Sequence, residues 1–389
     1  MLSCQKHLFS LPESVHYLNC AYMSPVLKRV EEAGIEGIRR KRDPSAITPA
    51  DFFEDAHRVR RLFARLINAA DPHRIAIIPS VSYGVATVAK NTRVGRRQNI
   101  VVAHQQFPSN VYAWRRLAAE TGSTVRTVEP PDAATRGEEW TGRLIAAITR
   151  STRVVALGPV HWADGTRFDL DQIAARTKEV GAALVIDGTQ SIGATPFDVQ
   201  RLEPDAVICA AYKWLLGPYS IGLAYLGERY DRGTPLEETW MSRPGSDDFG
   251  GLVRYRDKYR SGASRYDMGE SSNFILMPML LAALEQILGW GVEEIEAYCR
   301  ALTADFREEA RRLGYGIEDD AWQAPHLFGL RVPPGVRRAD LQAMLALRGI
   351  SVSVRGDAVR VSPHVYNDAV DIAALLEVLR EAVATASPV

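Results

Sequence analysis

The sequence predicts an α/β fold in which a mostly parallel sheet is covered by helices on both faces. Three short apolar runs carry this prediction, at residues 183–186, 206–210 and 222–226. Uninterrupted apolar runs of this length are typical of strands buried on both faces of a sheet. Ligands of such sheets bind at the carboxyl ends of the strands. The first two runs are followed there by a carboxylate and an amine, Asp187 and Lys213.

Length and composition exclude several classes of protein. At 389 residues the chain can form a large core and two structural parts. Its 47 basic and 47 acidic side chains balance, which gives no electrostatic case for binding nucleic acid or an anionic membrane. We find no apolar run long enough to cross a bilayer and no secretory signal pattern. The four cysteines are not spaced as metal ligands, so we expect free thiols, a cytoplasmic protein and no metal site.

Two helices are expected before the first strand, at residues 24–42 and 51–69. The first begins at a Ser-Pro pair, which is typical of a helix start. Four aliphatic residues fall close to one face of it: Val26, Val30, Ile35 and Ile38. The second helix carries many arginines, which we expect to form a solvated face.

A candidate phosphate site follows the strand expected at residues 74–78. Further strands are expected at residues 74–78, 100–103, 124–128 and 154–157. Between the first two lies a helix at 83–90, with Ser82 placed to cap it. Free backbone N–H groups at a helix start bind phosphate readily, although a cap alone would also explain the serine. A polar loop at 130–140 and a helix from about residue 141 come later.

The C-terminal third alternates helices and strands. It follows an insertion at 228–264 that is too long for an ordinary connection, and an apolar helix at 279–288. Helices are expected at 292–313, 338–348 and 368–384, and strands at 326–332 and 349–355. Within 359–361 apolar and charged residues alternate, so Arg360 points away from its valine neighbours.

Asp187, Gln190 and Lys213 together meet the needs of one cofactor. Alone, Asp187 would be a turn residue and Lys213 a partly buried side chain. Pyridoxal phosphate requires an amine that forms a Schiff base and a carboxylate that keeps the pyridine nitrogen protonated. The protonated ring is the electron sink, which gives Asp187 a chemical purpose.

The motifs IDGTQ and AAYKWLLGP, with their order in the chain, resemble the class V aminotransferase family of fold-type I pyridoxal-phosphate enzymes. That family includes cysteine desulfurases, kynureninases, isopenicillin N epimerase-like proteins and C–S lyases. The resemblance extends from HYLNCAY at 16–22 to VRVSPHVYN at 359–367. It implies a seven-stranded sheet and a smaller α+β C-terminal domain. The implied division is a large cofactor-binding domain, 15–265, and a small domain, 1–14 plus 266–389.

The resemblance also implies which residues hold the cofactor. Its phosphate would lie at the helix start beside Val81 and Ser82, with Tyr212 as a further partner. Phe107 would stack on the cofactor ring, although ordinary core packing is its alternative. Kynureninase-like members have Phe in a similar context, whereas cysteine desulfurases have His.

A homodimer with shared active sites is a further implication. Trp240 and Ser272 would reach the phosphate of the neighbouring subunit, and the two N-terminal helices would join the dimer surface. The alternative to a dimer contact is that the arginines of these helices form a solvated face.

Four residues are implied in substrate binding: Asn19, Trp162, Asn273 and Arg360. The guanidinium of Arg360 would bind the α-carboxylate through two parallel hydrogen bonds. The alternative is that Arg360 is simply an exposed strand residue. Trp162 stands where cysteine desulfurases have Asn, which argues against a simple cysteine-like mode. Its neighbour His161 is either a general acid or a loop residue.

The nucleophile of cysteine desulfurases is missing. That family carries a cysteine shortly before Arg360, whereas residues 345–360 contain none. Lys213 can still remove the α-proton of an amino acid. Transamination is favoured because it needs only Lys213, Asp187 and Arg360. The alternatives are racemisation, a β-eliminating C–S lyase, a kynureninase-like hydrolase, or a non-catalytic binding protein, which the intact Asp187, Gln190 and Lys213 disfavour.

Overall fold

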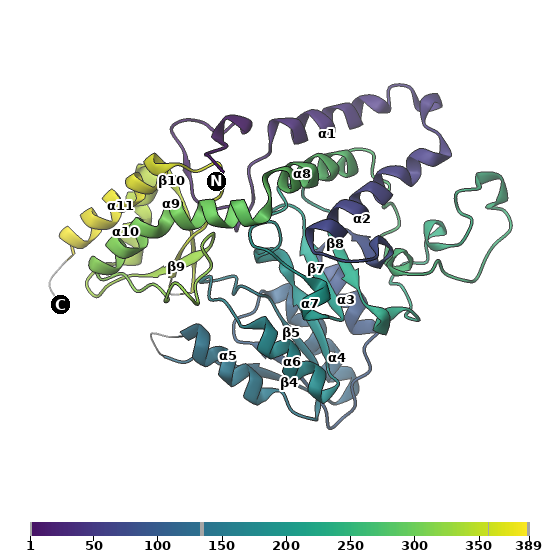
Figure 1. The fold of residues 1–389 in the computed structure, drawn as a ribbon, viewed down its shortest axis with the longest axis horizontal. Helices are drawn as coiled ribbons and strands as arrows, with labels where there is room; N and C mark the ends of the chain where they lie inside the picture. The colour runs from purple at the N-terminus through teal and green to yellow at the C-terminus, as the bar shows by residue number, and fades with distance from the viewer. Residues whose placement is uncertain (1, 133–135, 357, 387–389) are drawn as a thin grey trace.

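A seven-stranded sheet forms the centre of the computed structural model, which describes residues 2–132, 136–356 and 358–386 (Figure 1). Its strands are β2 (Ile75–Ile78), β3 (Asn99–Ala103), β4 (Thr124–Val128), β5 (Thr152–Leu157), β6 (Ala183–Asp187), β7 (Ala206–Ala210) and β8 (Gly222–Leu226). Their order is β2-β8-β7-β6-β5-β3-β4. β8 runs antiparallel to both of its neighbours, β2 and β7, and the other six strands share one direction. The predicted mostly parallel α/β fold is therefore confirmed.

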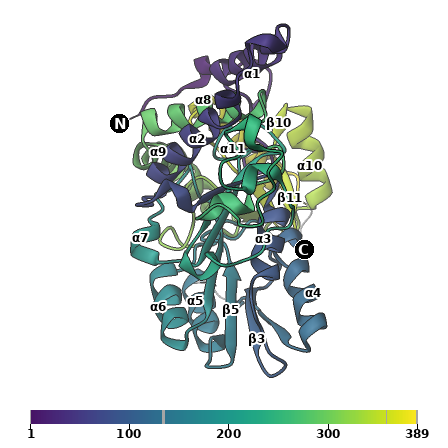
Figure 2. The same cartoon turned by 90° about the vertical axis from the view of Figure 1, so that its right-hand side faces the viewer.

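Helices cover both faces of this sheet, as Figure 2 shows. One face carries α3 (Val81–Lys90) and α4 (Tyr112–Thr121), and the other carries α5 (Arg136–Ala147), α6 (Leu170–Val180) and the short α7 (Val199–Leu202). Successive side chains of a strand point to opposite faces. Accordingly, Val101 packs in one apolar core with Leu144, while Val102 packs in the other with Trp114. The sheet is thus buried on both sides, as its apolar runs predicted.

Two sequence-based expectations fail around β4 and β5. Helices α4 and α6 were not anticipated, and α5 begins at Arg136, inside the polar loop expected at 130–140. The helix starts early because Trp140 is a core residue, whose indole Nε1 donates to the carbonyl of Val128 at 2.8 Å. Residues 133–135 of that loop lie outside the described residues.

The N-terminal helix α1 (Lys28–Arg40) begins four residues later than expected and buries a different face. The backbone before it is extended, because the Ser24 amide donates to the Tyr212 carbonyl at 3.0 Å. Its buried residues are Val30, Gly34 and Gly37, whereas Ile35 and Ile38 are exposed. These glycines let α1 approach α8 (Leu276–Trp290) closely, since a Cβ at Gly37 would overlap the backbone beside α8.

The C-terminal part is a three-stranded antiparallel sheet packed against helices. Its strands are β9 (Phe328–Arg331), β11 (Ser353–Arg355) and β12 (Ala358–Val361), in the order β11-β12-β9, and its helices are α9 (Val292–Arg312), α10 (Arg338–Leu347) and α11 (Ala369–Ala384). The strand expected at 349–355 is divided. Its first half, β10 (Ile350–Ser351), pairs in parallel with the N-terminal β1 (His16–Tyr17).

The division into domains stays a prediction, but packing contacts bear on it. Apolar side chains of α8, including Leu280 and Leu284, belong to the large core. That core also contains residues of α2 (Glu54–Leu66), such as Phe63.

The insertion at 228–264 contains short 3-10 helices at Glu228–Tyr230, Trp240–Ser242, Phe249–Gly251 and, at its end, Ala263–Tyr266. None of the helices formed by the described residues is both long and apolar enough to cross a membrane.

A buried ion pair joins α2, β2 and the segment after the insertion, and it generates a stability prediction. Asp267 accepts from the Ile77 amide at 2.8 Å and from Arg60, which also donates to the Ile75 carbonyl at 3.0 Å. Both charged side chains are buried. Removing one member of such a pair leaves an uncompensated charge in the interior.

We expect Asp267→Asn to lower the free energy of unfolding by about 3–5 kcal/mol, measured by urea denaturation. Asp340→Asn is the matched control, because Asp340 pairs with Arg337 at 2.7 Å in an exposed position, where about 0–1 kcal/mol is expected. Equal effects of the two substitutions would contradict the assignment.

Candidate active site

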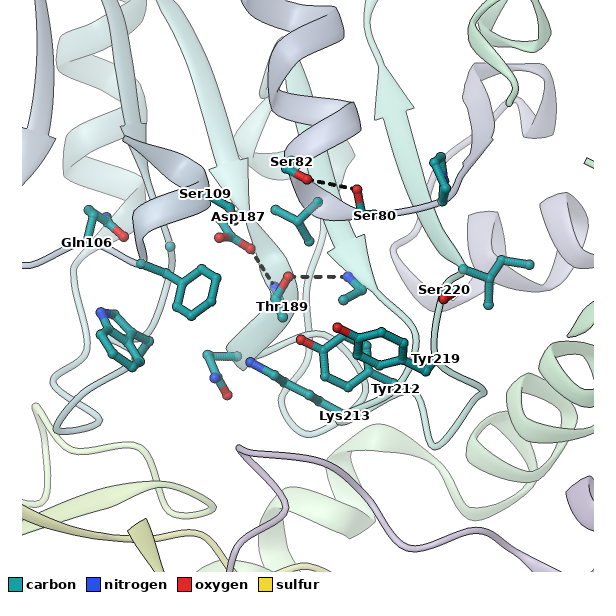
Figure 3. Close-up of a pocket in the computed structure, with 18 of the residues that line it drawn as sticks. Ser80, Ser82, Gln106, Ser109, Asp187, Thr189, Tyr212, Lys213, Tyr219 and Ser220 are labelled. Carbon is teal, nitrogen blue, oxygen red and sulfur yellow. Dashed lines mark hydrogen bonds between the residues drawn. The ribbon is translucent and has the colours of Figure 1, made fainter. Parts of the chain in front are cut away.

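A cavity of about 290 Å³ lies at the carboxyl edge of the central sheet, beside the ends of β6 and β7 and the start of α3 (Figure 3). Its wall includes Ser80, Val81, Ser82, Gln106, Phe107, Ser109, Trp162, Asp187, Thr189, Gln190, Tyr212, Lys213, Tyr219 and Ser220. The predicted edge of the sheet therefore carries the cavity. Eight of the sequence-predicted site residues meet there: Val81, Ser82, Phe107, Trp162, Asp187, Gln190, Tyr212 and Lys213.

Asp187 ends β6 and is held by a turn. The Thr189 amide donates to Oδ1 of Asp187 at 3.1 Å, and the Thr189 hydroxyl accepts from the Ala210 amide at 3.2 Å. These bonds join the end of β6 to the end of β7 (Figure 3). Burial raises the pKa of Asp187, while the Thr189 hydrogen bonds and the charge of Lys213 act in the opposite direction. The carboxylate is thereby fixed in the cavity wall.

Lys213 follows β7 and is buried, with its amine directed into the cavity. Its Nζ lies 5.5 Å from the centroid of the Phe107 ring and 5.6 Å from that of Tyr212. Burial, and secondly the charge of Arg360, lower the pKa of Lys213 to about 8, although Asp187 opposes them. A lowered pKa gives the amine a larger neutral fraction, the form that can act as a nucleophile or base.

The start of α3 forms the opposite side of the cavity and corrects one expectation. Ser80, not Ser82, caps the helix: it has an extended backbone, and its Oγ accepts from the Tyr83 amide at 3.2 Å. The hydroxyl of Ser82 lies 2.9 Å from that of Ser80 (Figure 3). Two hydroxyls and the first-turn N–H groups of a ten-residue helix thus face the cavity, a donor set suited to phosphate.

Gln190 is fixed at both ends of its amide. Its Oε1 accepts from the indole of Trp214 at 2.9 Å, and its Nε2 donates to the Ala21 carbonyl at 3.1 Å. Trp214 is the residue next to Lys213, so these bonds hold the lysine segment against β6. The second proton of Nε2 has no partner in these two bonds, and Gln190 lines the cavity.

Trp162 links the cavity wall to the C-terminal part. Its indole donates to the Gln105 carbonyl at 2.6 Å, and its ring meets Phe107 edge-on, with centroids 5.3 Å apart. Its carbonyl accepts from Nη1 of Arg360 at 2.8 Å. Arg360 is 1% exposed, and its Nε and Nη2 have no hydrogen-bond partner within the described chain. Buried donors without partners indicate a place for an anionic ligand.

His161 is engaged on both sides of its ring and does not line the cavity. Its Nδ1 lies 2.9 Å from Asp164, and its Nε2 lies 3.1 Å from the His104 carbonyl. The ring packs against Trp140, with centroids 5.0 Å apart. This arrangement favours a role in holding the Trp162 loop. A role as general acid stays a prediction.

Five other predicted site residues are not part of the cavity wall of their own chain, and one of them is Arg360, which contacts the wall residue Trp162. The Asn273 side chain accepts from the amides of Ile275 and Leu276 at the start of α8. Asn19, Trp240 and Ser272 also lie outside the cavity wall. Trp240 packs on phenylalanines of the α2 region and of the insertion.

Sequence reasoning missed Thr189 and Tyr219, which line the cavity, and Arg355, which lies over the ring of Trp162. Thr189 could have been found, because the residue two places after an Asp that ends a strand often closes a side-chain turn. Tyr219, whose ring centroid is 4.6 Å from that of Tyr212, follows a Gly-Pro turn that gave no sign of facing a cavity. Arg355 required the pairing of β11 with β12.

Comparisons with known proteins find one family model that covers most of the chain. The model of the family described as "Aminotransferase class-V" matches residues 47–381. The uncharacterized aminotransferase YcbU of Bacillus subtilis is 26% identical over 79% of this chain and 78% of its own. Isopenicillin N epimerase of Streptomyces clavuligerus is 24% identical over 82% of each chain.

Solved structures share the fold at low identity. The cysteine desulfurase CsdA of Escherichia coli superposes with a TM-score of 0.81 at 20% identity, covering 98% of each chain. The cystine C–S lyase C-DES, in complex with cysteine persulfide, gives a TM-score of 0.84 at 21% identity, covering 97% of this chain and 99% of that one. At these identities the likeness establishes the architecture alone.

The lowered pKa of Lys213 generates a pH-dependence prediction. Only the neutral amine is acylated, so labelling of cofactor-free protein should rise as pH increases through about 8. Asp187→Asn should move this midpoint down, and Arg360→Gln should move it up, because the two charges shift the pKa in opposite directions.

Competitive acetylation followed by mass spectrometry measures this midpoint. Exposed lysines, such as Lys178, supply an internal reference in the same samples. A Lys213 midpoint that coincides with theirs, and that neither substitution moves, would refute the electrostatic description.

Proposed function

The chain belongs to the class-V aminotransferase family, and on that premise we propose that it transfers the amino group of an amino acid. Enzymes of this family depend on pyridoxal 5′-phosphate. The observation that carries the proposal is a buried amine, Lys213, and a half-buried carboxylate, Asp187, that line one cavity beside a helix start.

The residues of the cavity fit this cofactor. The start of α3, with Val81 and Ser82, would hold the phosphate, and Asp187 would bind the ring nitrogen. Phe107 would pack against the ring, and Lys213 would hold the cofactor covalently. When bound, pyridoxal phosphate supplies an electron sink that stabilises negative charge at the substrate α-carbon.

The side chains of this chain supply the proton transfers and the orientation. Lys213 takes the α-proton of the substrate and returns it at another carbon, a role that a pKa of about 8 suits near neutral pH. Arg360 offers Nε and Nη2 to the α-carboxylate, since Nη1 is already committed to the Trp162 carbonyl. The rings of Phe107 and Tyr212 lie beside the amine, with centroids 5.5 Å and 5.6 Å from Nζ.

A desulfurase mechanism finds no nucleophile among the described cysteines near this site. Cys20, Cys209 and Cys299 are buried, and burial raises the pKa of Cys20 to about 12. A reactive thiol needs exposure and a lowered pKa. Transamination requires no thiol, which supports it as the leading proposal. The free cysteines also support a reducing, cytoplasmic compartment.

A β-eliminating or kynureninase-like reaction is the second candidate, and the tyrosine pair favours it. Burial raises the pKa of Tyr212, so its hydroxyl stays protonated and can donate a proton. Its ring packs on that of Tyr219 at the cavity, with centroids 4.6 Å apart. A proton donor at this position could assist a leaving group on the β-carbon.

We also propose a homodimer in which each chain completes the other's site. Trp240, Ser272 and Asn273 lie outside the cavity of their own chain, and Trp240 is partly exposed. On the α1 surface, Val26, Ile35 and Ile38 are also exposed. An aliphatic surface of this kind suits a self-complementary interface.

Lys213 carries the test of the proposed chemistry. Borohydride reduction of the holoprotein, followed by peptide mapping, should place the pyridoxyl label on Lys213. Lys213→Ala should lower amino-group transfer by about 10²–10⁴-fold or more, whereas the surface substitution Lys178→Ala should not. Mass spectrometry of products from an amino-acid panel separates keto acids, racemised amino acids and eliminated fragments. Eliminated fragments without keto-acid exchange would replace transamination by the second candidate.

Subunit mixing tests the shared site. Lys213→Ala and Asn273→Ala should each be inactive alone, because each damages every site. In a mixed dimer, one site combines an intact Lys213 with an intact Asn273 of the other chain. Random mixing should therefore restore about a quarter of wild-type activity for a two-fold dimer. No recovery after mixing and verified subunit exchange would place each site within a single chain.

A further inference from the structure

Two arginines share one face of the β11–β12 hairpin. In this antiparallel pair Ser353 lies opposite Arg360, and Arg355 lies opposite Ala358. Alternate residues of a strand point to the same face, so Arg355 and Arg360 are diagonal neighbours on that face. Strand geometry alone therefore brings a second guanidinium next to the proposed carboxylate ligand.

Both guanidiniums face the ring of Trp162, which is part of the cavity wall. The central carbon of Arg355 lies 5.7 Å from the ring centroid, and that of Arg360 lies 6.0 Å from it. An indole face attracts cations, so the ring holds the two arginines beside a residue that lines the cavity, although neither guanidinium is itself part of the cavity wall. Lys213 is close enough that both arginine charges lower its pKa.

This edge carries more positive charge than one α-carboxylate requires. The hydrogen bonds that the structure gives to the two guanidiniums end on backbone carbonyls: Arg355 donates to Val354 at 2.7 Å, and Arg360 donates to Trp162 at 2.8 Å. Neither forms an ion pair with a carboxylate in the described part of the chain. Like charges that adjoin on one sheet face repel each other. A ligand with two negative groups would remove this repulsion.

We propose that the substrate is a dicarboxylic amino acid, whose α-carboxylate binds Arg360 and whose second carboxylate binds Arg355. The proposal rests on the function proposed above and adds the class of substrate to it. Arg355 is then a specificity-determining residue. It takes no part in the proton transfers, and a half-buried position leaves it free to turn toward a ligand.

Unreactive anions test the second carboxylate site without turnover. Succinate and glutarate lack an amino group, and propionate and butyrate are their monocarboxylate counterparts. Calorimetric titration of the holoprotein should show that the dicarboxylates bind about tenfold or more tightly, the effect of an added charge-assisted contact. Arg355→Gln should remove this preference, and Arg355→Lys should retain part of it. Arg348→Gln is the matched control, because Arg348 pairs with Glu381 at 2.9 Å on the surface.

Kinetics provide the second readout. For glutamate against glutamine, or aspartate against asparagine, Arg355→Gln should lower kcat/KM of the acid by about 10–100-fold and leave that of the amide within about twofold. Equal binding of mono- and dicarboxylates by the wild type, or an equal loss for acid and amide, would overturn the assignment. If no amino acid in the panel reacted, the proposed transamination would fail, while the anion titration would still decide the role of Arg355.

Discussion

Burial of Lys213 beside the half-buried Asp187 is the constraint on which the rest of the site depends. Burial disfavours the charged form of each group, and their mutual attraction offsets part of that effect. An amine that must alternate between its protonated and neutral forms benefits from this balance. Thr189 fixes the carboxylate, and the aromatic rings of Phe107 and Tyr212 lie beside the amine. Parallel strands make the arrangement possible, because the ends of β6 and β7 meet at one edge.

The sequence was sufficient for those features that depend on local patterns. Apolar runs located the strands of the central sheet, and the residues after them located Asp187 and Lys213. Local patterns failed where tertiary contacts decide. Nothing near Ser24 indicates that its amide is taken by Tyr212, which delays the start of α1. The aliphatic residues of that helix suggested the wrong buried face, because close packing on α8 selects the glycines.

The site residues also divide into those that local sequence patterns identify and those that tertiary contacts determine. Ser82 was expected at the helix start and lines the cavity, but the dihedral angles that make Ser80 the cap are not written in the sequence. His161 was recognised as a candidate, yet its contacts with Asp164 and His104 depend on how a loop folds. Trp240 and Asn273 are positions whose proposed role involves another chain, so a single-chain structure leaves that role as a proposal. The position of Arg355 depends on the register between β11 and β12, whereas residues 349–355 were expected to form one strand, with no partner assigned to it.

The pairing of the N-terminal segment with the end of the chain has a consequence for biosynthesis. The Ala21 amide donates to Ser362, 341 positions later, and β1 pairs only with β10. Nearly the whole polypeptide must therefore leave the ribosome before residues 16–21 find their partners, and the Ala21 carbonyl that holds Gln190 is placed at the same time. Translation proceeds at about 5–20 residues per second. The core of the central sheet can therefore assemble well before residues 16–21 pair with the C-terminal part. The site is therefore completed late in synthesis.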